Sequence, residues 1–66
     1  MKVNERIKEL RKEKNISQQA LAEVIGVSQK AIDFWEKGIN EPKACYIVTL
    51  ASFFNVSTDY LLGIED

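Results

Sequence analysis

The sequence predicts an all-α domain of five short helices, with a tight turn between the second and the third. Apolar residues recur at helical spacing in separate segments, and Ser or Asn stands where helices would begin or end. Apolar residues make up 45% and charged residues 29% of the chain, with only three Gly and one Pro. This is the composition of a globular helical protein. At 66 residues, positions 1–66 are expected to form a single domain.

The first helix is expected over Asn4–Glu13. Val3, Ile7 and Leu10 recur at helical spacing and form one apolar stripe, while Glu, Lys and Arg cover the remaining surface. Asn15 is suited to the left-handed conformation that ends a helix. We therefore expect this helix to pack on the core through a single face.

Residues 17–38 contain two helix starts. Ser17 and Ser28 each precede a run with helical periodicity, so each is expected to act as an N-cap. Gly26 lies at the bend between the two helices, because glycine tolerates positive φ. We expect the third helix over Gln29–Lys37, with Gly38 ending it in the left-handed conformation. The buried side of the second helix is expected to consist of Leu21, Ala22, Val24 and Ile25.

The spacing within this segment is typical of two helices that cross steeply. Ala22 is small enough for a close approach of the two backbones, and Gly26 allows the chain to reverse. Ile32 is a stiff apolar residue that fills the angle between the helices. Trp35 lies one turn further on and is expected to anchor the core.

Two further helices are expected after this segment. Pro42 is suited to the first position of the fourth helix, where its missing N–H has no cost. Asn55 is expected to end that helix, Ser57 to cap the fifth and Gly63 to end the fifth. The inward residues are expected to be Ala44, Ile47, Leu50, Ala51 and Phe54 in the fourth helix, and Tyr60, Leu61 and Ile64 in the fifth.

The chain resembles the lambda-repressor-like (Xre) family of helix-turn-helix DNA-binding domains over nearly its whole length. The residues that carry the resemblance are Arg11, Gln18, Gly26, Trp35, Glu36, Gly38, Pro42 and the closing segment 56–63. The resemblance implies a compact five-helix fold with the helix-turn-helix at helices two and three. It also implies a sequence-specific, double-stranded DNA-binding transcriptional regulator, expected to be a bacterial or phage repressor that acts as a dimer on a two-fold operator.

The third helix is the expected recognition helix, because an α-helix fits the major groove and its N-terminal residues reach base edges. Gln29 is suited to an adenine edge, and Lys30 to guanine or to a phosphate. Asp33 is suited to accept from a cytosine amino group, to repel wrong registers on the DNA, or to orient Lys30 or Lys37. Phe34 departs from the polar or basic residue of many family members. It offers apolar contact to a thymine methyl group, or it packs on its own helix or on a partner protein.

Phosphate contacts are expected around this helix. Gln18 is expected to face outward at a helix N-terminus, where unpaired N–H groups attract anions. The resemblance implies an ion pair between Arg11 and Glu36, with Arg11 also close to the DNA backbone. The motif residues Ala22, Gly26, Ile32, Trp35 and Glu36 are expected to be structural. The expected phosphate contacts are Arg11, Ser17, Gln18, Lys37 and Asn40.

Composition sets limits on function. The net charge of −1 is low for a DNA-binding protein, and positive charge is concentrated in residues 1–16, so a shallow salt dependence is expected. One Cys and no His rule out an internal disulfide and leave no basis for a metal site, a cofactor or catalytic chemistry. No segment suits a membrane span or a signal peptide, so a cytoplasmic location is expected.

A homodimer is expected, because one such domain on a short site buries too little surface for tight specific binding. The alternative function is a protein-interaction module on the same fold, antitoxin-like or an anti-regulator, which the acidic balance, Asp33 and Phe34 favour. Family members often continue into a C-terminal sensing or oligomerising domain, and the sequence leaves open whether this chain is a whole repressor or part of one. The expected dimer interface consists of Ile39, Tyr46, Val48, Phe53 and the C-terminal residues.

Overall fold

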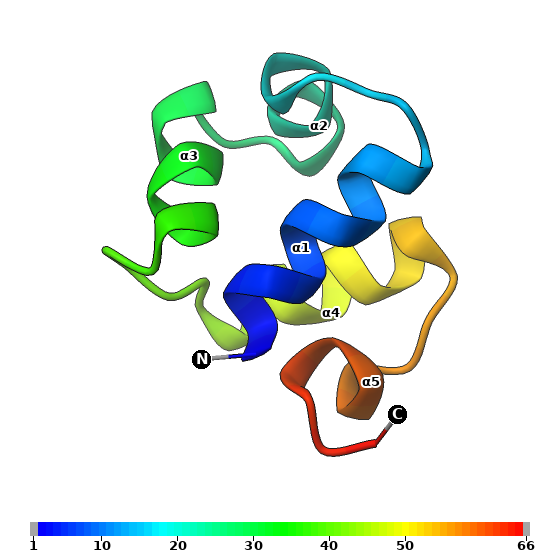
Figure 1. The fold of residues 1–66 in the computed structure, drawn as a ribbon. Coiled ribbons are helices and arrows are strands. Elements are labelled where there is room, and N and C mark those ends of the chain that lie inside the picture. Colours follow the sequence, from blue (N-terminus) through cyan, green and yellow to red (C-terminus); the bar gives the residue numbers. More distant parts are fainter. Residues whose placement is uncertain (1, 66) are drawn as a thin grey trace.

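Five helices surround one core in the computed structural model, which describes residues 2–65 (Figure 1). They are α1 (Lys2–Glu13), α2 (Gln18–Ile25), α3 (Gln29–Lys37), α4 (Ala44–Phe54) and α5 (Thr58–Leu62). The predicted all-α class and the predicted bounds of the third helix are confirmed. Among residues 2–65 there is no helix with the length and apolar character needed to cross a membrane.

Three helices begin at serine N-caps, as predicted. Ser17, Ser28 and Ser57 have extended backbones. Each side-chain oxygen accepts a hydrogen bond of 2.9–3.1 Å from the backbone N–H three residues later. The caps satisfy donors that a helix start leaves without an intrahelical partner, so they fix where α2, α3 and α5 begin.

Left-handed residues end the helices, also as predicted. Asn15 and Asn55 adopt φ values of 60° and 58° after α1 and α4. Gly38 has φ 77°, and its N–H donates to the carbonyl of Trp35 at 3.2 Å. The chain therefore turns sharply away at the end of α3, which leaves the last turn of that helix accessible to contacts from α1.

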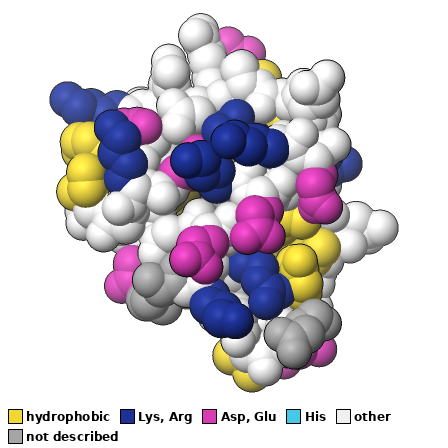
Figure 2. All heavy atoms as spheres, in the orientation of Figure 1, with side chains coloured by type: hydrophobic (Ala, Val, Ile, Leu, Met, Phe, Trp, Pro, Cys, Tyr) yellow, Lys and Arg dark blue, Asp and Glu magenta, His cyan; other side chains and the backbone are white. Residues whose placement is uncertain are grey.

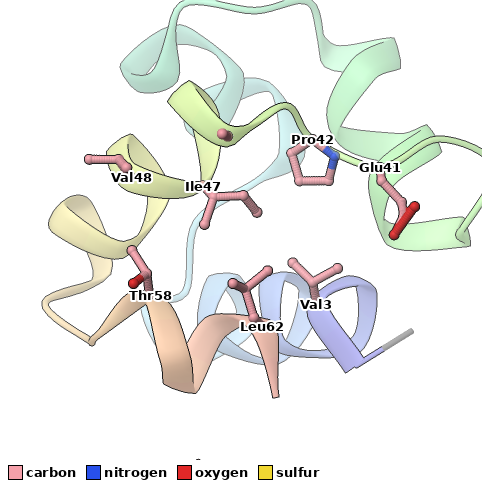
Figure 3. Close-up of a pocket in the computed structure, with 8 residues that line it drawn as sticks. Val3, Glu41, Pro42, Ile47, Val48, Thr58 and Leu62 are labelled. Carbon is pink, nitrogen blue, oxygen red and sulfur yellow. The ribbon is translucent and has the colours of Figure 1, made fainter. Parts of the chain in front are cut away.

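Two helix starts differ from the prediction. α1 begins at Lys2 instead of Asn4, because Val3 is only 1% exposed and continues the stripe that packs on the core. Pro42 is not the first residue of α4: Lys43 is the N-cap and the helix begins at Ala44. Pro42 is buried ahead of the helix and lines the same groove as Val3 of α1 (Figure 3).

The core draws one completely buried side chain from each helix. Ile7, Leu21, Ile32, Leu50 and Leu61 are all 0% exposed and come from α1 to α5 in order. Every helix of the described chain thus contributes apolar burial, which is the main stabilising term in so small a fold. The other buried apolar residues are Val3, Ala22, Ile25, Trp35, Ile47, Ala51 and Phe54.

Three residues that were predicted to be buried are exposed. Val24 is 56% exposed, because the eight-residue α2 buries only a narrow stripe. Ala44 is exposed at the first position of α4, ahead of the part that packs on the core. Ile64 is 72% exposed, because it follows the left-handed Gly63, where the chain turns away from the core.

Two aromatic residues of α4 are less exposed than predicted. Tyr46 packs on Trp35, with ring centroids 5.5 Å apart, and Phe53 packs on Phe54, with ring centroids 5.1 Å apart. Both residues are half-buried against the core. The exposed apolar surface of α4 is therefore smaller than the sequence pattern indicates.

Candidate nucleic-acid interface

The two helices α2 and α3 pack against each other at the edge of the molecule (Figure 1). Ala22 is 2% exposed and Ile32 is 0% exposed. Gly26 takes φ 88° at the bend, and its N–H donates to the carbonyl of Ala22 at 2.8 Å. The small residue, the left-handed turn and the apolar plug expected from the sequence therefore occupy the predicted places.

The outer face of α3 is exposed and polar at both ends, with one acidic and one aromatic side chain half-buried in the middle. Gln29 and Lys30 are exposed in its first turn and Lys37 is exposed in its last. Asp33 and Phe34 are half-buried between them. The Nζ atom of Lys30 lies 5.6 Å from the centroid of the Phe34 ring, within the range of a cation–π interaction. Phe34 therefore packs against its own helix, one of the alternatives left open by the sequence.

The N-termini of α2 and α3 are suited to attract an anion. A helix start leaves N–H groups without intrahelical partners and carries a partial positive charge. Neither helix has an acidic residue in its first turn that would oppose this charge. Ser17 accepts the capping bond through Oγ, and its hydroxyl proton is a further donor at the same place.

A half-buried ion pair joins α1 to the last turn of α3. Arg11 Nε lies 2.6 Å from Glu36 Oε2, and Arg11 Nη2 donates to Glu36 Oε1 at 3.0 Å. The two side chains are 12% and 4% exposed. The hydrogen bond to Glu36 raises the pKa of the Arg11 guanidinium above its usual value. The ion pair implied by the family resemblance is therefore present, and it is bidentate.

Gln18 does not face outward, which corrects the prediction. Its Nε2 atom donates to Asp33 Oδ1 and to Glu36 Oε1, both at 3.2 Å. Both acceptors are carboxylates, so only the amide nitrogen can fill this position. The prediction failed because helical spacing indicates a face of α2 but not the two carboxylates of α3 that lie opposite it.

Asp33 continues this set of contacts to the outer surface. Its Oδ2 atom lies 2.9 Å from Lys37 Nζ, one turn further along α3. The hydrogen bonds from Lys37 and then from Gln18 lower the pKa of the Asp33 carboxyl group. The ion pair is compatible with one of the roles expected for Asp33, which is to orient Lys37. We call Arg11, Glu36, Gln18, Asp33 and Lys37 the clamp network.

Asn4 makes a second contact between α1 and α3, which the sequence analysis did not identify. Its side-chain amide donates to the backbone carbonyl of Trp35. Asn4 is 6% exposed, and it is the one buried polar residue in the part of the chain that the structure describes. A signal was present in the sequence, because Asn4 precedes Ile7 by three positions and so shares the apolar stripe of α1.

Basic side chains gather over α1 and α3 on the face seen in Figure 2, with Asp and Glu side chains between them. The basic segment of the sequence thus lies beside α3, although the two are separate along the chain. In the clamp network, Arg11 is paired with Glu36 and Lys37 is paired with Asp33. Part of the basic surface is therefore already paired within the domain.

The residues expected at a dimer interface are only partly exposed. Ile39 and Val48 are 59% and 60% exposed, whereas Tyr46 and Phe53 are packed against the core. Val48 also lines an apolar groove of about 340 Å³ between α1, α4 and α5 (Figure 3). The groove is lined by Val3, Glu41, Pro42, Ala44, Ile47, Val48, Thr58 and Leu62.

An all-α domain in which a short helix is held by two others and leaves its first turn exposed has the geometry of a helix-turn-helix domain. A match to the helix-turn-helix family covers residues 7–61. The chain belongs to the lambda-repressor-like (Xre) helix-turn-helix family.

The chain is similar to a transcriptional activator and to a repressor protein. The transcriptional activator BcrR of Enterococcus faecalis is 39% identical over 66 residues, which are 100% of this chain and 32% of that protein. The repressor protein C2 of Salmonella phage P22 is 40% identical over 60 residues, which are 91% of this chain and 28% of that protein. The chain thus spans about a third of the length of these two relatives.

The fold is also found in a solved protein–DNA complex. The crystal structure of the P22 c2 repressor with a synthetic operator superposes with a TM-score of 0.86 at 38% identity. The match covers 92% of this chain and 92% of that one. At this identity and coverage, the likeness extends over the whole helix-turn-helix domain.

Proposed function

We propose that this chain is a sequence-specific double-stranded DNA-binding domain of a transcriptional regulator, of the repressor type. The observation that carries the proposal is the exposed first turn of α3, which holds Gln29 and Lys30. The N-terminus of α2, which has no acidic residue in its first turn, meets the same helix through the contact of Gln18 with Asp33. The crystal structure of the similar P22 c2 repressor with operator DNA supports it. Repression would follow from occupancy, because α3 in the major groove of a promoter blocks access to polymerase.

The base-reading residues in this proposal are Gln29 and Lys30. Gln29 is suited to pair with an adenine edge, and Lys30 with the N7 and O6 atoms of guanine. Phe34 supports Lys30 through its ring and presents its exposed part to a thymine methyl group. Asp33 acts on recognition by holding Lys37, since its carboxylate already accepts bonds from Lys37 and Gln18.

The proposed phosphate contacts fall into two groups. Ser17, Lys37 and Asn40 are exposed and reach a phosphate without breaking a contact to the core. Gln18 uses both amide hydrogens on Asp33 and Glu36, and Arg11 makes three hydrogen bonds, to Glu36 and to the carbonyl of Ile16. We therefore assign Gln18 and Arg11 mainly to positioning α3, with phosphate contact requiring that their present bonds be shared.

A homodimer on a two-fold operator completes the proposal. One domain presents a single short helix to the groove, which is less contact than tight specific binding to DNA needs. Ile39 and Val48 are the exposed apolar residues suited to the dimer contact. We propose that residues 1–66 act as one DNA-binding unit and that a regulator of this kind works where the chromosome lies, in the bacterial cytoplasm.

The alternative of a protein-interaction module now has less support. The features that favoured it were the acidic balance of the chain, which is unchanged, the charge of Asp33 and an exposed Phe34. Asp33 is paired with Lys37 and Phe34 is half-buried beneath Lys30. The apolar groove beside Val48 is the remaining surface that would serve a protein partner.

The direct test is a selection of binding sites from random duplex DNA with the purified 66-residue chain, carried out at low and at moderate salt. We expect an enriched palindromic sequence whose half-sites lie one helical turn apart, about 10 base pairs. The spacing would establish the dimer and the sequence would define the operator. Retention of all duplexes without preference, or no retention, would contradict the proposal and favour a protein partner.

A further inference from the structure

Two polar contacts hold the last turn of α3 against α1. Asn4 donates to the carbonyl of Trp35, and Arg11 pairs with the side chain of Glu36. Asn4 and Arg11 are seven residues apart on α1, with the completely buried Ile7 between them, so the three share one face of that helix. The two contacts therefore act at separate points along α1. Two separate contacts fix the angle between α3 and α1, which a single contact would not.

The Asn4 contact fixes the backbone of α3, whereas the clamp network joins side chains. Arg11 and Glu36 meet through long side chains, which can shift together when a helix tilts. Asn4 bonds instead to the backbone of α3, at a carbonyl that also accepts the N–H of Gly38 at 3.2 Å. The Asn4 amide also lies next to Gly38, where a Cβ atom would stand 3.8 Å from Asn4 Oδ1. A short, buried side chain bonded to the helix backbone leaves little freedom at this end of α3.

From these contacts we infer that Asn4 is a positioning residue for DNA reading, which sets the angle of α3 on the domain. The inference rests on the proposed function, since it concerns how the first turn of α3 meets base edges. That turn holds Gln29 and Lys30, at the opposite end of the helix from the Asn4 contact. If the last turn of α3 tilts, the first turn of the helix moves with it. Loss of the Asn4 contact therefore weakens base readout more than it weakens phosphate contact.

The test compares the affinity of the 66-residue chain for two duplexes, one with the selected operator sequence and one with the same bases scrambled. Partial unfolding lowers binding to both duplexes equally, so their affinity ratio reports geometry and not stability. For Asn4→Ala we expect the ratio to fall at least about fivefold, the lower range of what one poorly matched base pair costs. The matched control is Asn55→Ala, which removes an asparagine at a strained position beyond α4, and should leave the ratio unchanged.

Asn4→Asp gives a second readout that does not depend on comparing stabilities. A carboxylate cannot donate to the Trp35 carbonyl, whereas a protonated carboxyl group can. Burial raises the pKa of such a group, so the affinity ratio of this variant should recover as the pH falls from 8 to about 5. The unchanged chain, measured over the same range, corrects for the pH dependence of DNA binding itself.

The outcomes separate the inference from the proposed function. A lowered ratio in Asn4→Ala with recovery of Asn4→Asp at low pH supports the positioning role. Unchanged ratios in both variants overturn it while leaving the proposed function in place. Should Asn4→Ala not fold, the pH profile of Asn4→Asp decides alone, with a flat profile overturning the inference. Absence of any preference in the unchanged chain overturns the proposed function and the inference together.

Discussion

The ion pair between Arg11 and Glu36 affects the stability of this domain at the scale of single residues. Arg11 and Glu36 are 12% and 4% exposed, so removing either leaves the other charge in the interior without its partner. Such a loss costs about 3 kcal/mol or more, which is most of the roughly 3–5 kcal/mol that a core of this size supplies. Replacing only one residue of the pair is therefore expected to destabilise the fold.

We predict that Arg11→Ala is close to unfolded at room temperature, whereas the paired replacement Arg11→Met with Glu36→Leu is more stable than either single variant. The paired replacement removes both buried charges and adds apolar contact. Urea denaturation followed by the fluorescence of Trp35 measures the free energy of unfolding of each variant. A double variant less stable than both single ones would show that the ion pair itself, and not an orphaned charge, stabilises the fold.

Asp33 gives the domain a defined pH dependence. Hydrogen bonds from Lys37 and Gln18 lower the pKa of its carboxyl group in the folded state. Its contribution to stability is therefore present above the unfolded pKa of about 3.9 and is lost as the pH falls through the lower folded pKa. We predict that Asp33→Asn reduces the urea midpoint at pH 6 and that this difference shrinks as the pH falls below the unfolded pKa of the carboxyl group. A difference that stays constant over this range would show that the carboxylate charge is irrelevant.

Among the elements, the turns were the most predictable part of the sequence. The capping roles of Ser17, Ser28 and Ser57 and the left-handed Asn15 and Asn55 depend on each residue and its near neighbours, so a sequence pattern indicates them directly. The start of α1 was less predictable, because no capping residue precedes Val3. Tertiary packing of Val3 extends that helix instead.

Two glycine turns with similar backbones should respond differently to substitution. Gly26 and Gly63 have φ values of 88° and 83°, so alanine is strained at both, by about 1–2 kcal/mol. A Cβ atom at Gly26 meets nothing within 4 Å, whereas one at Gly63 would stand 2.5 Å from the Cβ of Lys2. We predict that Gly63→Ala lowers the melting temperature more than Gly26→Ala, measured by circular dichroism. Equal losses would mean that α5 shifts freely from α1.

At the scale of the whole molecule, the fold could be predicted but the contacts of the site could not. Periodicity placed Ile7, Leu21, Ile32, Leu50 and Leu61 in the core, because each lies on an apolar stripe. The partners of Gln18 and Asn4 lie 15 to 31 residues away, and helical spacing does not specify them. The expected outward orientation of Gln18 was wrong and Asn4 was missed for this reason, although both belong to correctly predicted helices.

The charge pairs also set the expected salt dependence of DNA binding. Arg11 is paired with Glu36 within the domain, and Lys37 is paired with Asp33 at a surface where Lys37 is 62% exposed. We predict that Lys37→Ala reduces the slope of log Kobs against log salt by about 1 per protomer, because one phosphate contact is lost. Fluorescence anisotropy of a labelled duplex at several salt concentrations measures this slope. An unchanged slope would show that Asp33 keeps Lys37 away from the DNA.

The central claim is that the first turn of α3 reads bases, and it is tested most directly with Gln29→Ala on the selected and scrambled duplexes. The account predicts that this variant loses about 1–3 kcal/mol of affinity for the selected duplex only, with relaxed preference at one base pair in each half-site. Lys37→Ala, the matched phosphate variant, should instead weaken binding to both duplexes alike. Equal loss on both duplexes in Gln29→Ala, or no loss on either, would contradict the account.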